Sequence, residues 1–425
     1  MTRLIANTAP AGGGPVVVEV VALVVLVEAV VVDVESTEVV VLSSALVEVA
    51  VASGRVVPGA APDSAVVVVG PGPAVVVGSD SDPVQAAVTR SRARITASRF
   101  IGPHYARSPH TGEGSLRPVL KERPVIELIG APQDLGQVRR GVDMGPSAVR
   151  VAGVISRLNS LGFEVIDHGN IDCAEMATAS PGADSARFLD AIVADSAQLA
   201  ETVETAVRAG RFPLVIGGDH SIAVGTMGGV AAVEPRQGLL WVDAHADFNT
   251  PETSPSGNIH GMPVAAILGE GPDSLVNVAG VNPKALEENT VIIGLRSVDR
   301  LEADRLRESR VSFFTMHDID LLGIASVIEE AIEILTSNGV ENVHLSFDAD
   351  AIDPRQAPGT GTPVVGGFTY RESHLMMELL AEADIITSAD FTEVNPILDD
   401  QNQTAELIVE LIGSLAGQRV VKPGT

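Results

Sequence analysis

Gly238-Leu-Leu-Trp-Val-Asp-Ala-His-Ala-Asp247 is an apolar run that leads directly into three polar residues at every second position. The apolar part is typical of a buried strand. Side chains two residues apart in an extended segment lie on the same face, so Asp243, His245 and Asp247 point the same way. Carboxylate and imidazole groups that converge at the end of a buried strand are typical metal ligands. This stretch therefore predicts one half of a metal site.

Two other apolar runs supply the second half. In Val343-His-Leu-Ser-Phe-Asp-Ala-Asp350 the carboxylates of Asp348 and Asp350 follow a strand on one face. Leu214-Val-Ile-Gly-Gly-Asp-His220 places His220 after a third strand, with two glycines that permit a tight turn. Together the three segments offer two imidazoles and four carboxylates.

Six protein ligands are too many for one ion that must also bind water and substrate, whereas two ions that share bridging carboxylates can use them. Oxygen-rich sites with some imidazole suit Mn²⁺ better than metals that prefer thiolates. Two ions a few ångströms apart generate a bridging hydroxide near neutral pH. The alternative is that strand-end aspartates are helix caps or turn formers, which explains Asp219, Asp353 and Asp390 equally well.

Two further segments point to a substrate. The loop 249–263 follows the first metal segment and is rich in hydroxyl and amide groups, which suits a small polar substrate. His260 lies in this loop beside Gly261 and is placed to shuttle protons rather than to bind metal. Glu393 ends another predicted strand, where its carboxylate can accept two hydrogen bonds from a guanidinium group, or form a structural ion pair.

Short β-rich runs alternate with amphipathic stretches from residue 123 onward. Such alternation predicts an α/β fold with three layers, α-β-α, around a mainly parallel sheet of about eight strands. Ligands of such sheets bind beyond the carboxyl ends of the strands, where the polar motifs lie. We predict strands at 125–130, 163–166, 214–217, 239–243, 291–295, 311–315, 343–347 and 385–391, and helices at 147–161, 186–209, 324–335 and 403–415.

The composition narrows the class of protein. A formal net charge of −27 argues against nucleic acid as a partner and is compatible with a cationic substrate, although acidic surfaces usually serve solubility. The single cysteine, Cys173, excludes an intrachain disulfide and a cysteine-rich zinc site, and it fits a cytoplasmic protein.

Residues 1–120 have a different composition from the rest of the chain. They contain valine runs but no aromatic residue before Phe100, which predicts a poor core. The longest apolar run, Val20 to Val27, is far too short to cross a membrane, and no standard signal peptide is present. We expect a low-complexity, poorly ordered extension without a function. Translation from upstream of the true start would explain it, and the alternative is a regulatory arm. Residues 121–425 then form the catalytic domain.

From about residue 124 to 417 the chain resembles the ureohydrolases, and among them the arginases most. Three family signatures stand in order: Gly217-Gly-Asp-His-Ser221, Asp243-Ala-His-Ala-Asp247 and Ser346-Phe-Asp-Ala-Asp-Ala-Ile-Asp-Pro354. The segment 134–146 resembles the loop at the mouth of the arginase site, and Ser256-Gly-Asn-Ile-His-Gly-Met-Pro263 resembles the arginase substrate loop.

The resemblance implies a role for each matching residue. Two Mn²⁺ ions per subunit would be held, one by His220, Asp243, Asp247 and Asp348, the other by Asp243, His245, Asp348 and Asp350. In the family, a hydroxide that bridges the ions attacks the guanidinium carbon of L-arginine and yields ornithine and urea. Asp247 would relay a proton to the leaving amine, His260 would shuttle protons, and Glu393 would anchor the guanidinium. The amino acid head group would be bound by Asn249, Ser256, Asn258, Asp299 and Glu302.

One position departs from the pattern, because Ser297 stands where related arginases often have aspartate. The alternatives are agmatinase or another ureohydrolase of guanidino or formimino substrates, a non-catalytic homologue, and a deacetylase of similar fold. The family also implies a homotrimer or a homohexamer. We expect no membrane partner.

Overall fold

The computed structural model describes residues 125–419 and, before them, four short strands. These four belong to a first unit, Met1–Glu113, and the rest of the described chain belongs to a second unit, Gly114–Thr425. In the first unit β1 (Leu23–Val25) pairs antiparallel with β4 (Val47–Val49), and β2 (Ala29–Val34) pairs antiparallel with β3 (Thr37–Leu42). The prediction for residues 1–120 otherwise lies outside the described residues and stays a prediction.

The second unit is built on one eight-stranded sheet in which every neighbouring pair is parallel. This confirms the predicted fold class and all eight predicted strands, with ends that differ by a few residues. From edge to edge the order is β12 (Ser312–Thr315), β11 (Thr290–Leu295), β10 (Gln237–Val242), β13 (Asn342–Asp348), β14 (Ile386–Thr392), β9 (Phe212–Gly217), β5 (Val125–Ala131) and β6 (Glu164–Asn170).

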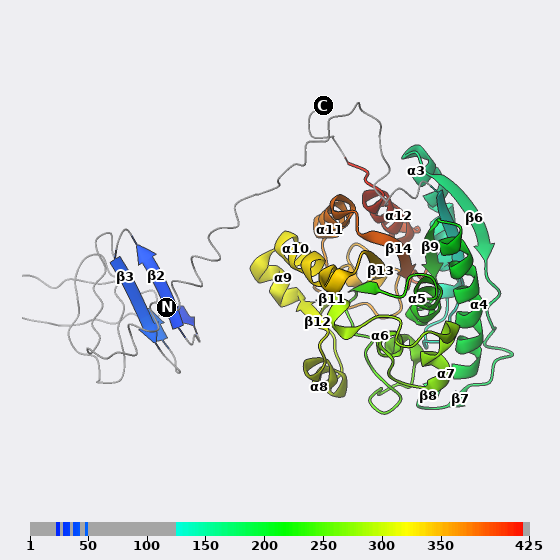
Figure 1. Cartoon of the computed structure of the whole chain (residues 1–425), viewed down its shortest axis with the longest axis horizontal. Coiled ribbons are helices and arrows are strands. Elements are labelled where there is room, and N and C mark those ends of the chain that lie inside the picture. The colour runs from blue at the N-terminus through cyan, green and yellow to red at the C-terminus, as the bar shows by residue number, and fades with distance from the viewer. Residues whose placement is uncertain (1–22, 26–28, 35–36, 43–46, 50–124, 420–425) are drawn as a thin grey trace, which may run out of the picture. The chain divides into compact units, whose positions relative to one another are not determined.

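Helices cover both faces of this sheet (Figure 1). One face packs against α2 (Gly145–Val151), α3 (Val154–Ser160), α9 (Met316–Leu322), α10 (Ile324–Leu335), α11 (Tyr370–Ala383) and α12 (Gln403–Leu415). The other packs against α4 (Leu189–Arg208), α5 (Ala223–Ala231) and α6 (Pro263–Leu268), and α7 (Asp273–Val276) lies against α4 and α6. A further helix, α8 (Arg300–Glu308), follows β11. No helix among the described residues is long and apolar enough to span a membrane.

The predicted helices are confirmed at 324–335 and 403–415, and two others need correction. The helix predicted at 147–161 is two helices, because Gly153 adopts a left-handed conformation with φ of 93° between α2 and α3. The helix predicted at 186–209 begins only at Leu189. Ala186–Arg187 instead forms the short strand β8, which pairs with β7 (Gly182–Ala183). A strand of two residues leaves no periodicity that a sequence pattern can show.

Candidate metal centre and substrate cavity

The four central strands bring the predicted ligands together. In the order β10, β13, β14, β9 they lie side by side, although β13 and β14 come more than a hundred residues after β9 in the chain. Their carboxyl ends lead to Asp243, Asp348, Glu393 and His220 respectively. Parallel strands end at the same edge of a sheet, so residues from distant segments converge there.

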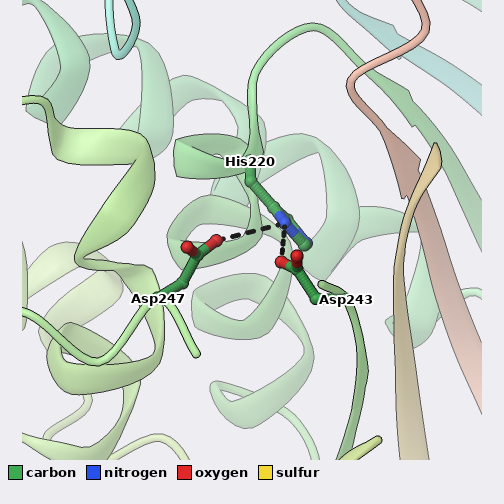
Figure 2. A group of neighbouring side chains, drawn as sticks. All are labelled: His220, Asp243 and Asp247. Carbon is green, nitrogen blue, oxygen red and sulfur yellow. Dashed lines mark ion pairs between the residues drawn. The ribbon is translucent and has the colours of Figure 1, made fainter. Parts of the chain in front are cut away.

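The first cluster surrounds one ring nitrogen of His220. Its Nδ1 atom lies 3.1 Å from Asp243 Oδ2, 3.3 Å from Asp247 Oδ2 and 3.1 Å from Asp348 Oδ2 (Figure 2 shows the first two contacts). The imidazole is fully buried, and Nδ1 has no hydrogen-bond partner of acceptable geometry. A buried nitrogen without a hydrogen bond, faced by three carboxylates, is the arrangement of a metal ligand.

The second cluster is formed around His245. Its Nδ1 atom lies 3.3 Å from Asp243 Oδ1 and 3.1 Å from Asp350 Oδ2. Asp243 therefore belongs to both clusters and turns one oxygen toward each imidazole. Within each cluster, His220 with Asp243 and Asp247 or His245 with Asp243 and Asp350, the candidate ligand atoms lie within 4.8 Å of one another.

Neighbouring groups hold these ligands in place. The Trp241 indole stacks on the His220 ring at 3.9 Å between centroids, and its Nε1 donates to Asp243 Oδ2 at 3.0 Å. Thr362 Oγ1 donates to Asp350 Oδ2 at 2.8 Å. The guanidinium of Arg296 donates to the backbone carbonyl of Asp350 at 2.6 Å. Contacts of this kind fix the direction of metal ligands.

The titration of the two clusters reflects crowded, buried negative charge. Burial alone would lower the pKa of His220, but the carboxylates around it raise the pKa well above its ordinary value. His245 behaves in the same way, with a pKa raised to about 12. Burial and the charge of Asp243 raise the pKa of Asp247 to about 7, and burial and Asp350 raise that of Asp348. Bound cations would relieve this repulsion, so the residues fit a divalent metal.

Glu393 lies beside the first cluster and is fully buried. Its Oε1 atom accepts a hydrogen bond from the backbone N–H of His220 at 3.1 Å and lies 3.1 Å from His260 Nδ1. Its Oε2 atom accepts from Gln137 Nε2 at 3.0 Å. Burial would lower the pKa of His260, but the bond to Glu393 outweighs it and the pKa rises to about 9. This pKa favours the cationic form of His260 at neutral pH.

A cavity of about 130 Å³ opens above the metal ligands. Many of the residues that the sequence predicts to bind metal or substrate line this cavity. Its lining comprises His245, Asp247, Asn249, Ser254, Ser256, His260, Gly261, Ser297, Asp299, Glu302, Asp348 and Thr362. Asn258 is the one predicted head-group residue outside this lining. Glu393 and three of the predicted metal ligands, His220, Asp243 and Asp350, are fully buried and do not line it.

The predicted head-group residues differ in how free their polar atoms are. Asn249 Nδ2 donates to Asp299 Oδ2 at 3.3 Å, which joins two of them across the cavity. Glu302 is buried, and its two oxygens accept from the backbone N–H groups of Phe248 at 2.8 Å and Asp299 at 3.2 Å. Glu302 therefore supports the wall of the cavity, while Asp299 presents its carboxylate at the surface.

For Asp219, Asp353 and Asp390 the sequence did not distinguish a metal ligand from a helix cap or turn former. In the structure each of them accepts a hydrogen bond from a neighbouring group. Asp219 caps the turn at His220 and accepts from the backbone N–H of Ser221 at 3.0 Å. Asp353 accepts from the backbone N–H of Arg355 at 3.1 Å. Asp390 accepts from Ser346 Oγ inside the sheet.

Some contacts of the site were not predicted, namely those of Trp241, Gln137, Thr362 and the polar side chains of β13 and β14. A signal existed for the last group, since polar residues alternate with apolar ones at positions 343–348 of a strand that is buried on both faces.

Comparison with known proteins agrees with the geometry. The model of the arginase family matches residues 125–417. The arginase of Bacillus caldovelox is 54% identical over 297 residues, which cover 70% of this chain and 99% of that arginase. The crystal structure of arginase from Bacillus cereus superposes with a TM-score of 0.66 at 52% identity, over 70% of this chain and 99% of that one. The agmatine ureohydrolase of Thermoplasma volcanium is more distant, with 25% identity and a TM-score of 0.52 over 71% and 94%.

Proposed function

The chain belongs to the arginase family, and from that premise we propose that it hydrolyses L-arginine to L-ornithine and urea in the cavity above the two clusters. The observation that carries this proposal is the position of Asp243 between two clusters. One of its carboxylate oxygens faces His220 and the other faces His245, and each imidazole belongs to a separate cluster of candidate ligand atoms. Identities of 45–54% to arginases, against 25% to the agmatine ureohydrolase, favour arginine over agmatine as substrate.

We propose two Mn²⁺ ions as the metal. His220, Asp247, Asp243 and Asp348 would hold one, and His245, Asp350, Asp243 and Asp348 would hold the other. Oxygen-rich ligand sets with one imidazole each suit this ion. When bound, the pair would lower the pKa of a shared water and so supply a hydroxide nucleophile near neutral pH.

The residues of the chain would orient the substrate and move its protons. Guanidinium is a poor electrophile, so its carbon must be held close to the nucleophile. The buried carboxylate of Glu393 would anchor the guanidinium through a charge-assisted fork. Hydrolysis breaks the bond from that carbon to Nε of arginine, which gains a proton as it leaves and becomes the δ-amino group of ornithine. Asp247 would deliver this proton, and His260, which lines the cavity, would exchange protons with solvent.

The α-amino and α-carboxylate groups of the substrate would bind at the end of the cavity away from the metal ligands. Asn249, Ser256 and Asp299 line it there and offer amide, hydroxyl and carboxylate groups. The first two suit an α-carboxylate, and the third suits an α-amino group. Agmatine has no α-carboxylate and would leave part of this wall unpaired, which favours an amino acid substrate.

The direct test is metal analysis together with urea release from L-arginine and agmatine, measured side by side. We expect two Mn²⁺ per subunit and a clear preference for arginine. Asp350→Asn should weaken one ion selectively, because Asp350 belongs to only one cluster. Equal or greater turnover of agmatine would contradict the substrate assignment. Unchanged manganese stoichiometry and affinity in the variant would contradict the assignment of two ions.

We also propose a homotrimer or homohexamer in the cytoplasm. Support for assembly comes from one edge of the sheet, where Phe313 of β12 and Leu321 and Leu322 of α9 are exposed, the two leucines by 69% and 54%. Apolar groups that gather at a surface favour a protein partner. Light scattering coupled to gel filtration measures the subunit number, and a monomer at micromolar concentration would contradict this proposal.

A further inference from the structure

A chain of hydrogen bonds runs inside the sheet behind His220. The Nε2 atom of His220 lies 2.8 Å from Ser346 Oγ, which donates to Asp390 Oδ1 at 2.5 Å. The other carboxylate oxygen of Asp390 lies 3.0 Å from His344 Nε2. The far end of the chain is Ser388, whose Oγ lies 2.9 Å from His344 Nδ1. All five side chains are buried, and the proposed reaction gives no task to Asp390 or His344.

The register of two central strands creates this arrangement. In the pairing of β13 with β14, Ser346 stands opposite Asp390 and His344 stands opposite Ser388. These residues share the face of the sheet that lies opposite the apolar side chains of β13, since strand residues alternate. Polar groups at the centre of a parallel sheet are costly unless they are hydrogen-bonded. Here each of them has a partner.

The donors and acceptors fix the direction of every bond near His220. Burial would raise the pKa of Asp390, but His344 and the other neighbouring donors outweigh it, so the pKa lies below its ordinary value. Asp390 is therefore ionised, and an ionised carboxylate can only accept hydrogen bonds. Ser346 has one proton, which it gives to Asp390. Its oxygen must then accept from His220, so Nε2 carries the proton whenever the ring is neutral, as a ring that binds a cation through Nδ1 must be. The lone pair of Nδ1 is left facing the carboxylates of the first cluster.

We propose that Asp390, anchored by His344, is a positioning residue that selects the metal-binding tautomer and the orientation of His220. This inference rests on the proposed function, in which His220 holds one of two ions. Stacking on Trp241 fixes the plane of the ring, but a stack does not select which nitrogen carries the proton. The bond to Ser346 does, and Asp390 determines the direction of that bond. Partners of metal-bound histidines commonly act in this way.

The test measures metal binding in the full-length protein. Asp390→Asn replaces the pure acceptor with a group that also donates, so Ser346 is no longer forced to accept from His220. We expect the affinity for one of the two Mn²⁺ ions to fall by about 10- to 100-fold, while the other ion stays close to wild type. Electron paramagnetic resonance of free Mn²⁺ during titration reports both affinities without any use of substrate.

Two substitutions of His344 provide a matched comparison. His344→Gln keeps an N–H donor for Asp390 and should retain most of the affinity, whereas His344→Leu removes the donor and should lose it. Ser388→Ala removes a buried hydroxyl of the same strand at the far end of the chain, and we expect metal affinity close to wild type. If His344→Leu does not fold, the comparison of Asp390→Asn with Ser388→Ala decides the question.

A purely structural role is distinguished by thermal unfolding with and without Mn²⁺. A bound ion raises Tm according to its affinity, so a positioning role shrinks the rise that Mn²⁺ causes. A structural role would lower Tm equally in both conditions. The inference is overturned if Asp390→Asn keeps wild-type affinity for both ions, or if His344→Gln and His344→Leu bind metal equally well.

The outcomes also separate this inference from the proposed function. A wild-type protein that binds Mn²⁺ but releases no urea from arginine contradicts the function and leaves the positioning role standing. A wild-type protein that does both, with variants that bind metal normally, contradicts only the positioning role. A wild-type protein without affinity for Mn²⁺ contradicts both.

Discussion

Glu393 shows at the scale of one residue how a single carboxylate is prepared for a cationic ligand. It is fully buried, and its backbone adopts a left-handed conformation with φ of 62°, which a residue other than glycine rarely adopts. Asp247 has the same feature, with φ of 47°. Such conformations cost about 1–3 kcal/mol each and are frequent at, although not confined to, functional sites. Both residues belong to the proposed machinery, one for the guanidinium and one for metal and proton transfer.

Glu393→Gln keeps the shape and one acceptor oxygen but removes the charge. We predict that urea release falls by roughly 100-fold or more, because loss of a buried charge partner costs about 2–5 kcal/mol. The metal content should not change, since Glu393 belongs to neither cluster. Steady-state kinetics together with metal analysis check both statements. Activity close to wild type would remove Glu393 from the substrate site.

His260 leads to a prediction about pH. Its pKa is raised from 6.5 to about 9 by Glu393, so the folded protein binds a proton that the unfolded chain releases. The stabilisation is therefore fully present below pH 6.5 and is lost as the pH rises through 9. It amounts to a few kcal/mol, on the order of 3.

His260→Asn should lose this pH dependence. Its free energy of unfolding should lie below that of wild type at pH 6 and approach it above pH 9. Urea denaturation at several pH values, with a chelator present so that metal adds no charge, measures the difference. A gap between the two proteins that stays constant from pH 6 to pH 9.5 would contradict the role of this ion pair. Metal content should not change in the variant.

Among the elements, the turn that follows β9 at Gly218 connects the segments that form the site. The backbone N–H of Gly218 donates to Ala131 O at 2.8 Å, and its carbonyl accepts from the N–H of Glu393 at 2.8 Å. This turn therefore ties the ends of β5 and β14 to the loop of His220. A Cβ atom on Gly218 would lie 1.7 Å from the backbone oxygen of Gln133. Only glycine fits at such a close approach of two backbones.

Gly218→Ala should destabilise the protein by about 1–3 kcal/mol or more, because the two backbones must separate. The same movement displaces His220 and Glu393, so urea release should fall as well. Gly261→Ala is the matched control for stability, since a Cβ atom there has no neighbour within 4 Å. Chemical denaturation of both variants gives the comparison. Equal stability of Gly218→Ala and wild type would show that the two backbones can separate at little cost.

At the scale of the whole molecule, the arginase-like part of the chain accounts for the proposed activity. The family model covers residues 125–417, and the Bacillus caldovelox arginase is matched over 99% of its length. Every residue proposed for metal or substrate lies in this part. The first 120 residues have no assigned role in it.

A chain that begins at Ser115 should therefore keep full urea release and the same subunit number. Comparison of kcat/KM and of the light-scattering mass for the long and short chains measures this. The short chain should also aggregate less, since runs of valine are prone to β-pairing when exposed. Loss of turnover or of assembly in the short chain would show that residues 1–114 act as a regulatory arm instead.

Local order along the chain is enough to predict the strands, and it also points to the candidate metal ligands. The extended alternation predicted for Asp243, His245 and Asp247 does not continue that far, because β10 ends at Val242 and the three residues lie in an irregular segment beyond it, with φ of 47° at Asp247. Periodicity also predicted α10 and α12 with their ends, but it missed the break at Gly153 and the short strand before α4. These features depend on a single backbone angle and on pairing with another segment.

The tertiary structure was needed to show that Asp243 belongs to both clusters and which polar groups support the candidate ligands. The insertion of β13 and β14 between β10 and β9 is a long-range pairing that no local pattern fixes. That order brings Asp348 to the cluster of His220, places Gln137 on Glu393, and aligns Asp390 with Ser346. The candidate residues of the site can be predicted from sequence motifs. The distances between their side chains depend on strands that become neighbours only when the sheet forms.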